Sequence, residues 1–229
     1  MKRSTRNTIS VLLIAIPFYF TAILEKSVGS PDISVNGIFG LYMLYTFIGL
    51  LVIFFINKYL LKNTLNVFAL QKGSVLLDVS IAFLLLIFIY FINSIGNITY
   101  GRWFFVEIDR TQMMRSLNEM FSNPTYTIFL LGPFIWMTEG FLAFSRAFIL
   151  NNLWEINQSK TWVWISIILV ALLGAFIQLN NGLPAMINWF IILLASGFIY
   201  YKYRRIYPLL IAGILMQTIE LVSYWVYVY

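Results

Sequence analysis

The chain has 229 residues, of which 61% are hydrophobic and only 10% are charged. Soluble domains carry roughly 25% charged residues, so this composition indicates an integral membrane protein. There is no cysteine and no histidine, which excludes disulfides, thiol nucleophiles and Cys/His zinc sites. The net charge of +6 does not indicate a nucleic-acid partner, because the basic residues stand at the edges of apolar runs.

Seven apolar runs are long enough to cross a lipid bilayer as helices, at residues 8–24, 37–56, 75–95, 126–152, 162–179, 185–200 and 208–227. The first run is expected to stay as an uncleaved helix, because no small-residue cleavage site follows it. The sequence therefore predicts an all-α, polytopic membrane helix bundle of about seven transmembrane helices.

The only long polar connection lies at residues 96–123. Its apolar residues recur roughly at helical spacing, which predicts an amphipathic helix on the outer membrane surface, with a plain solvated loop as the alternative. We therefore expect residues 1–125 to hold three transmembrane helices and this outer amphipathic segment, and residues 126–229 to form a four-helix core.

The distribution of basic residues predicts the orientation of the chain. With seven spans and a cytoplasmic N-terminus, the inner segments carry ten bases and the outer segments four, which satisfies the positive-inside rule. The inner ten are Lys2, Arg3, Arg6, Lys58, Lys62, Lys72, Lys160, Lys202, Arg204 and Arg205, and the outer four are Lys26, Arg102, Arg110 and Arg115. The C-terminus is then expected outside.

Glu139 and Arg146 stand within one apolar run, where charges are costly and usually face a bundle interior. They are seven residues apart, or two helical turns, so they share one face of a helix. Three interpretations remain open: a structural pair that locks the helix in its bundle, a catalytic or ligand site, and a docking site for a partner.

Without histidine or cysteine, few chemistries remain for a membrane-embedded site. Rhomboid-type serine proteases and His-Glu-x-x-His zinc proteases need histidine, and presenilin-type proteases need two intramembrane aspartates. Glu139 and Glu220 remain as acid–base candidates, and hydrogen-bonding candidates are Gln178, Asn180, Asn181 and Gln217. Asn180 and Asn181 also suit a simple turn, and Glu220 also suits a structural hydrogen bond. No metal or other cofactor is expected.

The aromatic residues make up 18% of the chain and are interpreted as lipid-facing and interfacial packing. In particular, Trp154, Trp162 and Trp164 are expected at one membrane edge.

The last four spans resemble the CPBP family, which comprises CAAX proteases and bacteriocin-processing or bacteriocin-immunity proteins and is also called Abi. Arg146-Ala-Phe-Ile-Leu-Asn-Asn-Leu153 is similar to the second half of the family's first motif, and Pro133 precedes it. Thr138-Glu139 stands where the family has Glu-Glu, with a longer spacing to Arg146.

The family's two histidines are replaced in this chain. Phe176-Ile-Gln-Leu-Asn180 resembles the second motif, with Asn180 in place of histidine. Gly213-Ile-Leu-Met-Gln217 resembles the third motif, with Gly213 for histidine and Gln217 for asparagine. The resemblance implies that a glutamate activates water in active members while the histidines and asparagine stabilise developing charge. Loss of a single oxyanion donor costs roughly 10²–10³ in rate, so we expect little proteolysis here.

The resemblance therefore implies a degenerate member that keeps the bundle but lacks the protease chemistry. Such a protein is expected to act in a bacterial plasma membrane as a scaffold, regulator or immunity protein, bound to a membrane protein or to a lipidated or hydrophobic peptide. The first alternative is a divergent intramembrane peptidase that uses Glu139, Arg146, Asn180 and Gln217. The second alternative is a transporter or small-ligand binder with a polar cavity that includes Gln178, Asn181 and Glu220.

Overall fold

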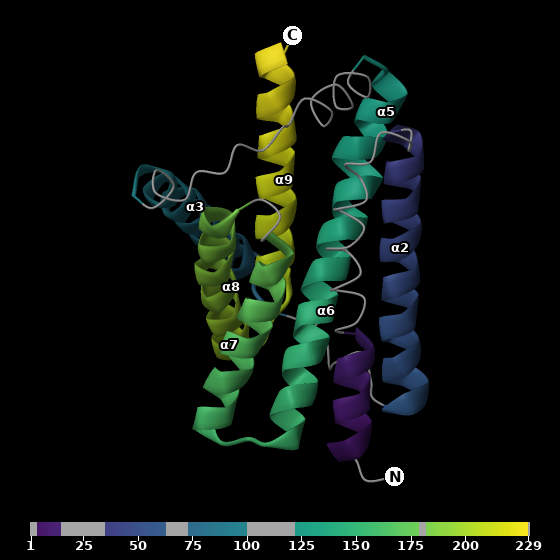
Figure 1. The fold of residues 1–229 in the computed structure, drawn as a ribbon, viewed down its shortest axis with the longest axis vertical. Coiled ribbons are helices and arrows are strands. Elements are labelled where there is room, and N and C mark those ends of the chain that lie inside the picture. The colour runs from purple at the N-terminus through teal and green to yellow at the C-terminus, as the bar shows by residue number, and fades with distance from the viewer. Residues whose placement is uncertain (1–3, 15–34, 63–72, 100–121, 179–181, 229) are drawn as a thin grey trace.

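The computed structural model describes residues 4–14, 35–62, 73–99, 122–178 and 182–228, and every regular element in these ranges is a helix (Figure 1). A short N-terminal helix covers residues 4–14. The further elements are α2 (Val35–Phe55), the π-helical turn η1 (Ile56–Leu60), α3 (Val75–Ile98), α5 (Pro124–Phe129), the π-helical turn η4 (Leu130–Phe134), α6 (Ile135–Ile156), α7 (Lys160–Ile177), α8 (Leu183–Tyr203) and α9 (Tyr207–Val228).

Five described helices are long and apolar enough to cross a membrane, judged by length and composition. They are Met43–Leu60, Val75–Gly96, Thr125–Ile156, Lys160–Ile177 and Leu183–Tyr203, and a shorter apolar helix covers Tyr207–Ser223. These helices indicate that the chain is a membrane protein with an all-helical fold. The count of seven spans stays a prediction, since residues 15–24 of the first expected span lie outside the described residues.

Side chains and turn residues determine where several helices begin and end. The hydroxyls of Ser74 and Ser159 accept hydrogen bonds from the backbone N–H groups three residues later, which caps α3 and α7. Gly182 has φ 92°, a conformation that glycine adopts readily, and Pro184 follows in the first turn of α8. Arg204 closes α8 in the left-handed region, at φ 53°, and the chain turns directly into α9.

The fourth span is longer than the predicted 126–152, because α5, η4 and α6 form one continuous helical run from Pro124 to Ile156. Pro133 lies inside the run and cannot donate the usual backbone hydrogen bond. The helix accommodates Pro133 by widening into the π-helical turn η4. The predicted amphipathic segment at 96–123 lies mostly outside the described residues, which end at 99 and resume at 122.

The helix α6 lies at the centre of the packing and contacts α2, α7 and α9 (Figure 1). Helix α3 packs on α8 and α9, and α7 packs on α8. The two long helices from the first half of the chain thus flank the last four on different sides. The predicted division of the chain at residue 125 stays a prediction. The helices on both sides of residue 125 pack in one bundle.

Two buried clusters hold this arrangement together. The larger cluster surrounds Phe141 and Phe148 of α6 and includes Ile14 of the N-terminal helix and Ile53 of α2. Gly49 allows α2 to approach Phe141 closely, since a Cβ atom at position 49 would lie 2.9 Å from Phe141 Cδ2. The smaller cluster joins α3, α8 and α9 through Ala82, Leu85, Leu86, Ile89, Ile192, Ala212 and Met216.

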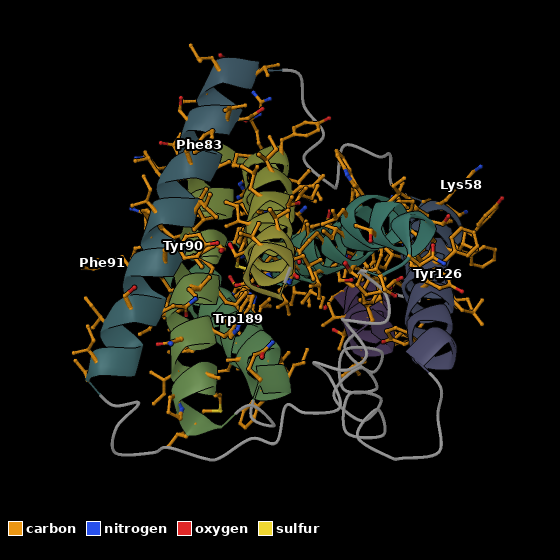
Figure 2. The ribbon with its side chains drawn as sticks, turned by 90° about the horizontal axis from the view of Figure 1, so that it is seen from above. Lys58, Phe83, Tyr90, Phe91, Tyr126 and Trp189 are labelled. Atoms are coloured by element: carbon orange, nitrogen blue, oxygen red, sulfur yellow. The ribbon has the colours of Figure 1, made fainter. Side chains whose placement is uncertain are left out.

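The outer side of α3 exposes large apolar side chains, among them Leu76, Ile87 and Phe91. Figure 2 looks along the longest axis of the molecule and places Phe91 on the outer side of α3 and Tyr90 on the side toward the neighbouring helices, among which Trp189 of α8 lies. An apolar outer face of this kind suits contact with lipid chains, because lipid tails impose no cost on exposed apolar groups.

Candidate functional site

Glu139 lies near the middle of the longest membrane helix. It is 14 residues from the start and 17 from the end of the run Thr125–Ile156, so at least about 20 Å of helix separates it from either end. A carboxyl group at this depth is costly to insert and is usually retained for a specific interaction. Glu139 therefore stands at the centre of the candidate site.

Three polar side chains interact with the Glu139 carboxyl group. Gln217 of α9 lies within hydrogen-bonding reach of it, and Arg146, two turns along α6, interacts with it electrostatically. Glu220 of α9 also lies within electrostatic range of Glu139. The packing of α6 against α9 thus brings together four of the residues that the sequence singled out as site candidates.

Gly213 of α9 faces the same carboxyl group. A Cβ atom at position 213 would lie 2.9 Å from Glu139 Cδ and closer still to Oε2, so α9 carries no side chain at the point where Glu139 meets it. Gly213 is the residue that the resemblance to the CPBP family predicts at the position of a family histidine, and this correspondence stays a prediction. In this arrangement the Glu139 carboxyl group occupies the space into which a side chain at 213 would extend.

The local structure of α6 fixes the position of Glu139. The π-helical turn η4 ends at Phe134, five residues before Glu139. The hydroxyl of Thr138 bonds back to the carbonyl oxygens of Phe134 at 2.9 Å and Ile135 at 3.1 Å. Turns of the π type are frequent at functional sites because they re-aim the side chains that follow. Thr138 and η4 thus place Glu139 directly after the π-helical turn that contains Pro133.

Of the other predicted site residues, the structure describes only Gln178. Gln178 stands at the C-terminal cap of α7, where its backbone N–H bonds to the carbonyl oxygens of Ala175 and Phe176. Asn180 and Asn181 lie outside the described residues. Tyr90 of α3 is an addition that the sequence did not indicate, since it lies within electrostatic range of Glu220. Only the contact between α3 and α9 reveals it.

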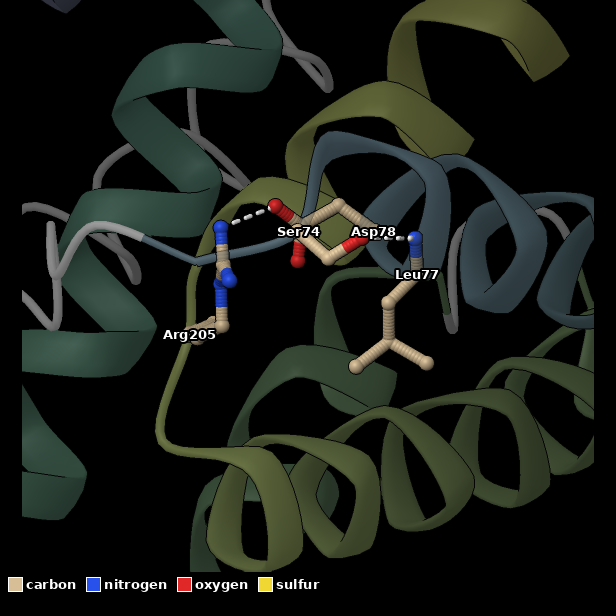
Figure 3. A network of polar contacts seen from close by, with 4 residues as sticks. All are labelled: Ser74, Leu77, Asp78 and Arg205. Carbon is tan, nitrogen blue, oxygen red and sulfur yellow. Dashed lines mark hydrogen bonds and ion pairs between the residues drawn. The ribbon is translucent and has the colours of Figure 1, made fainter.

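A second polar contact lies at the N-terminal end of α3. Asp78, in the first turn of α3, forms an ion pair with Arg205, which follows the end of α8 (Figure 3). Figure 3 also shows the Ser74 hydroxyl capping the N–H of Leu77 beside this pair. The sequence did not single out Asp78 as a candidate, and only the packing of α3 against α8 and α9 brings it to Arg205.

Metal coordination has little support in the part of the chain that the structure describes. Among these residues, no group of three or more acidic side chains gathers in a way that could hold a metal ion. The arrangement around Glu139 is instead one of hydrogen bonding and charge balance. It can hold a polar group or a basic side chain at membrane depth, or take part in proton transfer.

Comparisons of the chain with protein-family models, with curated proteins and with solved structures gave no match.

Proposed function

We propose that this chain is a non-proteolytic membrane protein that binds a membrane partner through the polar site around Glu139. The observation that carries the proposal is the placement of the Glu139 carboxyl group in the α6–α9 contact, against Gly213 and within hydrogen-bonding reach of Gln217, with Arg146 nearby. A charged group retained at this depth has a use beyond packing, because an apolar side chain would be far less costly there. The expected partner is another membrane protein or a lipidated or hydrophobic peptide.

The place of Gly213 supports a binding role over a hydrolytic one. Proteolysis needs groups that stabilise an oxyanion and exchange protons near neutral pH, and histidine commonly does both. Gly213 offers no side chain, and the Glu139 carboxyl group fills the adjoining space. Gln217 can donate a hydrogen bond but cannot exchange a proton in this pH range.

The proposal extends the resemblance to the CPBP or Abi family, which includes immunity proteins. We place the protein in a bacterial plasma membrane with its N-terminus in the cytoplasm and its C-terminus outside. The described bases support this orientation, since all except Arg146 stand at one end of the helices. They are Arg6, Lys58, Lys62, Lys160, Lys202, Arg204 and Arg205.

A peptidase assay tests the absence of proteolysis. The purified chain is reconstituted in vesicles and incubated with fluorogenic prenylated and unmodified hydrophobic peptides. We expect cleavage no faster than with the variant Glu139→Gln. Cleavage by the unaltered chain that Glu139→Gln abolishes, while Glu155→Gln on the same helix leaves it intact, would contradict the proposal.

That contrary result would favour the second candidate, a divergent intramembrane peptidase. One observation favours this candidate: Glu139 and Glu220 lie within electrostatic range of each other in a helix interface. Two neighbouring carboxyl groups can differ in proton affinity, so that one acts as acid and the other as base. The peptidase candidate predicts that Glu220→Gln also lowers the cleavage rate, whereas the binding proposal predicts no cleavage in any variant.

A further inference from the structure

Arg204 occupies an unusual position in the turn between α8 and α9. It is the C-terminal cap of α8 and has φ 53°, a left-handed conformation that is uncommon for a residue with a side chain. Its guanidinium carbon lies 4.4 Å from the centre of the Trp154 ring on α6 and 5.5 Å from the ring of Tyr201. The side chain is therefore held over an aromatic surface.

The aromatic surface beneath Arg204 is rigid. Trp154 is only 5% exposed, and its ring stacks on Tyr200 with centroids 5.8 Å apart. Tyr200 is fully buried, and its hydroxyl accepts a hydrogen bond of 2.7 Å from Asn151 Nδ2. Trp154 stands near the C-terminal end of α6, as the prediction of a membrane-edge position requires. Its ring, however, packs inward against the protein. These contacts fix the plane on which the guanidinium rests.

Arg204 and its neighbour Arg205 differ in their partners. Arg205 is ion-paired with Asp78, so that its charge is balanced within the protein. Among the described residues, Arg204 has no carboxylate partner, and its side chain is exposed. A guanidinium held over an aromatic ring by cation–π attraction keeps N–H groups available to bind an oxyanion in a bidentate way.

The depth of Arg204 identifies the oxyanion. The spans Leu183–Tyr203 and Thr125–Ile156 end beside Arg204 and Trp154, and the span Lys160–Ile177 begins at the same end. If these helices span a bilayer, this end of them lies at the level of the lipid phosphates. In the described residues this end carries seven bases, Arg6, Lys58, Lys62, Lys160, Lys202, Arg204 and Arg205, against two acids, Asp78 and Glu155. An excess of bases attracts anionic headgroups.

We propose that Arg204, held on Trp154 and Tyr201, forms a binding site for the phosphate of an anionic phospholipid. Lys202, which is exposed two residues earlier, adds positive charge beside the site. The site does not depend on Glu139 or on the proposed partner. It gives the turn between α8 and α9 a second role as the anchor of a lipid headgroup.

Native mass spectrometry of the full chain in detergent tests the proposal by titration with phosphatidylglycerol, with phosphatidylcholine as the reference lipid. We expect one phosphatidylglycerol molecule to bind preferentially. Arg204→Gln should weaken its binding at least about tenfold, the ratio that corresponds to one charge-assisted hydrogen-bonded pair. Arg204→Lys keeps the charge without the planar fork and should retain only part of the affinity.

Lys58→Gln is the matched control, because Lys58 is another exposed base in a span that ends at this side of the bundle. It should leave phosphatidylglycerol binding within twofold of the unaltered chain. Equal losses in Lys58→Gln and Arg204→Gln would mean diffuse surface charge and would overturn the proposal. Inorganic phosphate that displaces the lipid and binds as tightly on its own would overturn the assignment to a lipid.

Discussion

Gly213 on α9 lies directly against the carboxyl group of Glu139 on α6, so that backbone rather than a side chain meets the acid. Gln217, one turn further along α9, lies within hydrogen-bonding reach of the same carboxyl group. The contact links two helices at membrane depth through a polar group, which specifies their relative position more narrowly than apolar packing does. It also removes the space in which a catalytic side chain at 213 would stand.

Gly213→Ala should destabilise the protein because its methyl group displaces the Glu139 carboxyl group. We expect a loss of about 1–2 kcal/mol in the free energy of unfolding, since overpacking costs about 1–3 kcal/mol and alanine gains slightly as a helix former. Unfolding of the purified chain in mild detergent, followed by circular dichroism, measures this loss.

Two further variants test whether contact with the Glu139 carboxyl group causes the loss of stability in Gly213→Ala. In a Glu139→Ala background the second change, Gly213→Ala, should cost nothing, because the displaced carboxyl group is gone. Gly140→Ala, where a Cβ atom meets nothing within 4 Å, should be neutral or stabilising. An equal cost of Gly213→Ala in both backgrounds would disprove the contact.

Gly49→Ala should destabilise the protein by about 1–3 kcal/mol. The methyl group would meet the ring of Phe141, which is fully buried and cannot move aside easily. Gly40→Ala on the same helix is the control, since position 40 has open space around it. If both variants unfold at the same denaturant concentration as the unaltered chain, α2 does not pack on α6 as described.

Asp78→Asn should leave Arg205 with an unbalanced charge. The side chains of Arg205 and Asp78 are 12% and 5% exposed, and breaking such a buried pair costs about 3–5 kcal/mol. Arg205→Gln in the Asp78→Asn background should restore part of the loss, because no isolated charge then remains. Thermal unfolding checks both variants, and Lys160→Gln at an exposed base should have no effect. Additive losses in the double variant would argue against the pair.

Labelling of single cysteines tests the predicted orientation, and the chain has no cysteine of its own to interfere. Lys160→Cys and Lys202→Cys stand at one end of the helices and should react with a membrane-impermeant maleimide only from the cytoplasmic side. Val226→Cys near the end of α9 is exposed and should react only from the outer side. Reaction of positions 202 and 226 from the same side would show that α9 does not cross the membrane.

Composition and apolar run length predict much of the fold, because a helix is the simplest way to satisfy backbone hydrogen bonds in a bilayer. The runs at 75–95 and 185–200 correspond closely to the spans Val75–Gly96 and Leu183–Tyr203. The run at 126–152 was too short at its ends, because the helix extends from Pro124 to Ile156 and continues past the polar residues Asn151 and Asn152. The sequence also gives no sign of the π turn around Pro133. Length alone also does not indicate which helices pack together.

The sequence singled out Glu139, Arg146, Gln217 and Glu220 but not the contacts among them. The spacing of Glu139 and Arg146 placed them on one helix face, and they do interact electrostatically. That Gln217 and Glu220 meet Glu139 depends on the crossing of α6 and α9, which no local pattern determines. The pair Asp78–Arg205 and the stacking of Arg204 on Trp154 likewise join residues far apart in the sequence. The assigned roles of all these residues stay predictions.

The most direct test of the binding role is to purify the tagged chain from its native membranes in mild detergent and quantify co-purifying proteins by mass spectrometry. We predict one membrane partner in stoichiometric amount, retained by Glu155→Gln and lost from Glu139→Gln and Arg146→Gln variants that fold normally. Equal recovery of the same partner with Glu139→Gln would contradict a partner-binding site at Glu139. Purification of the chain without any partner in every detergent would contradict it as well.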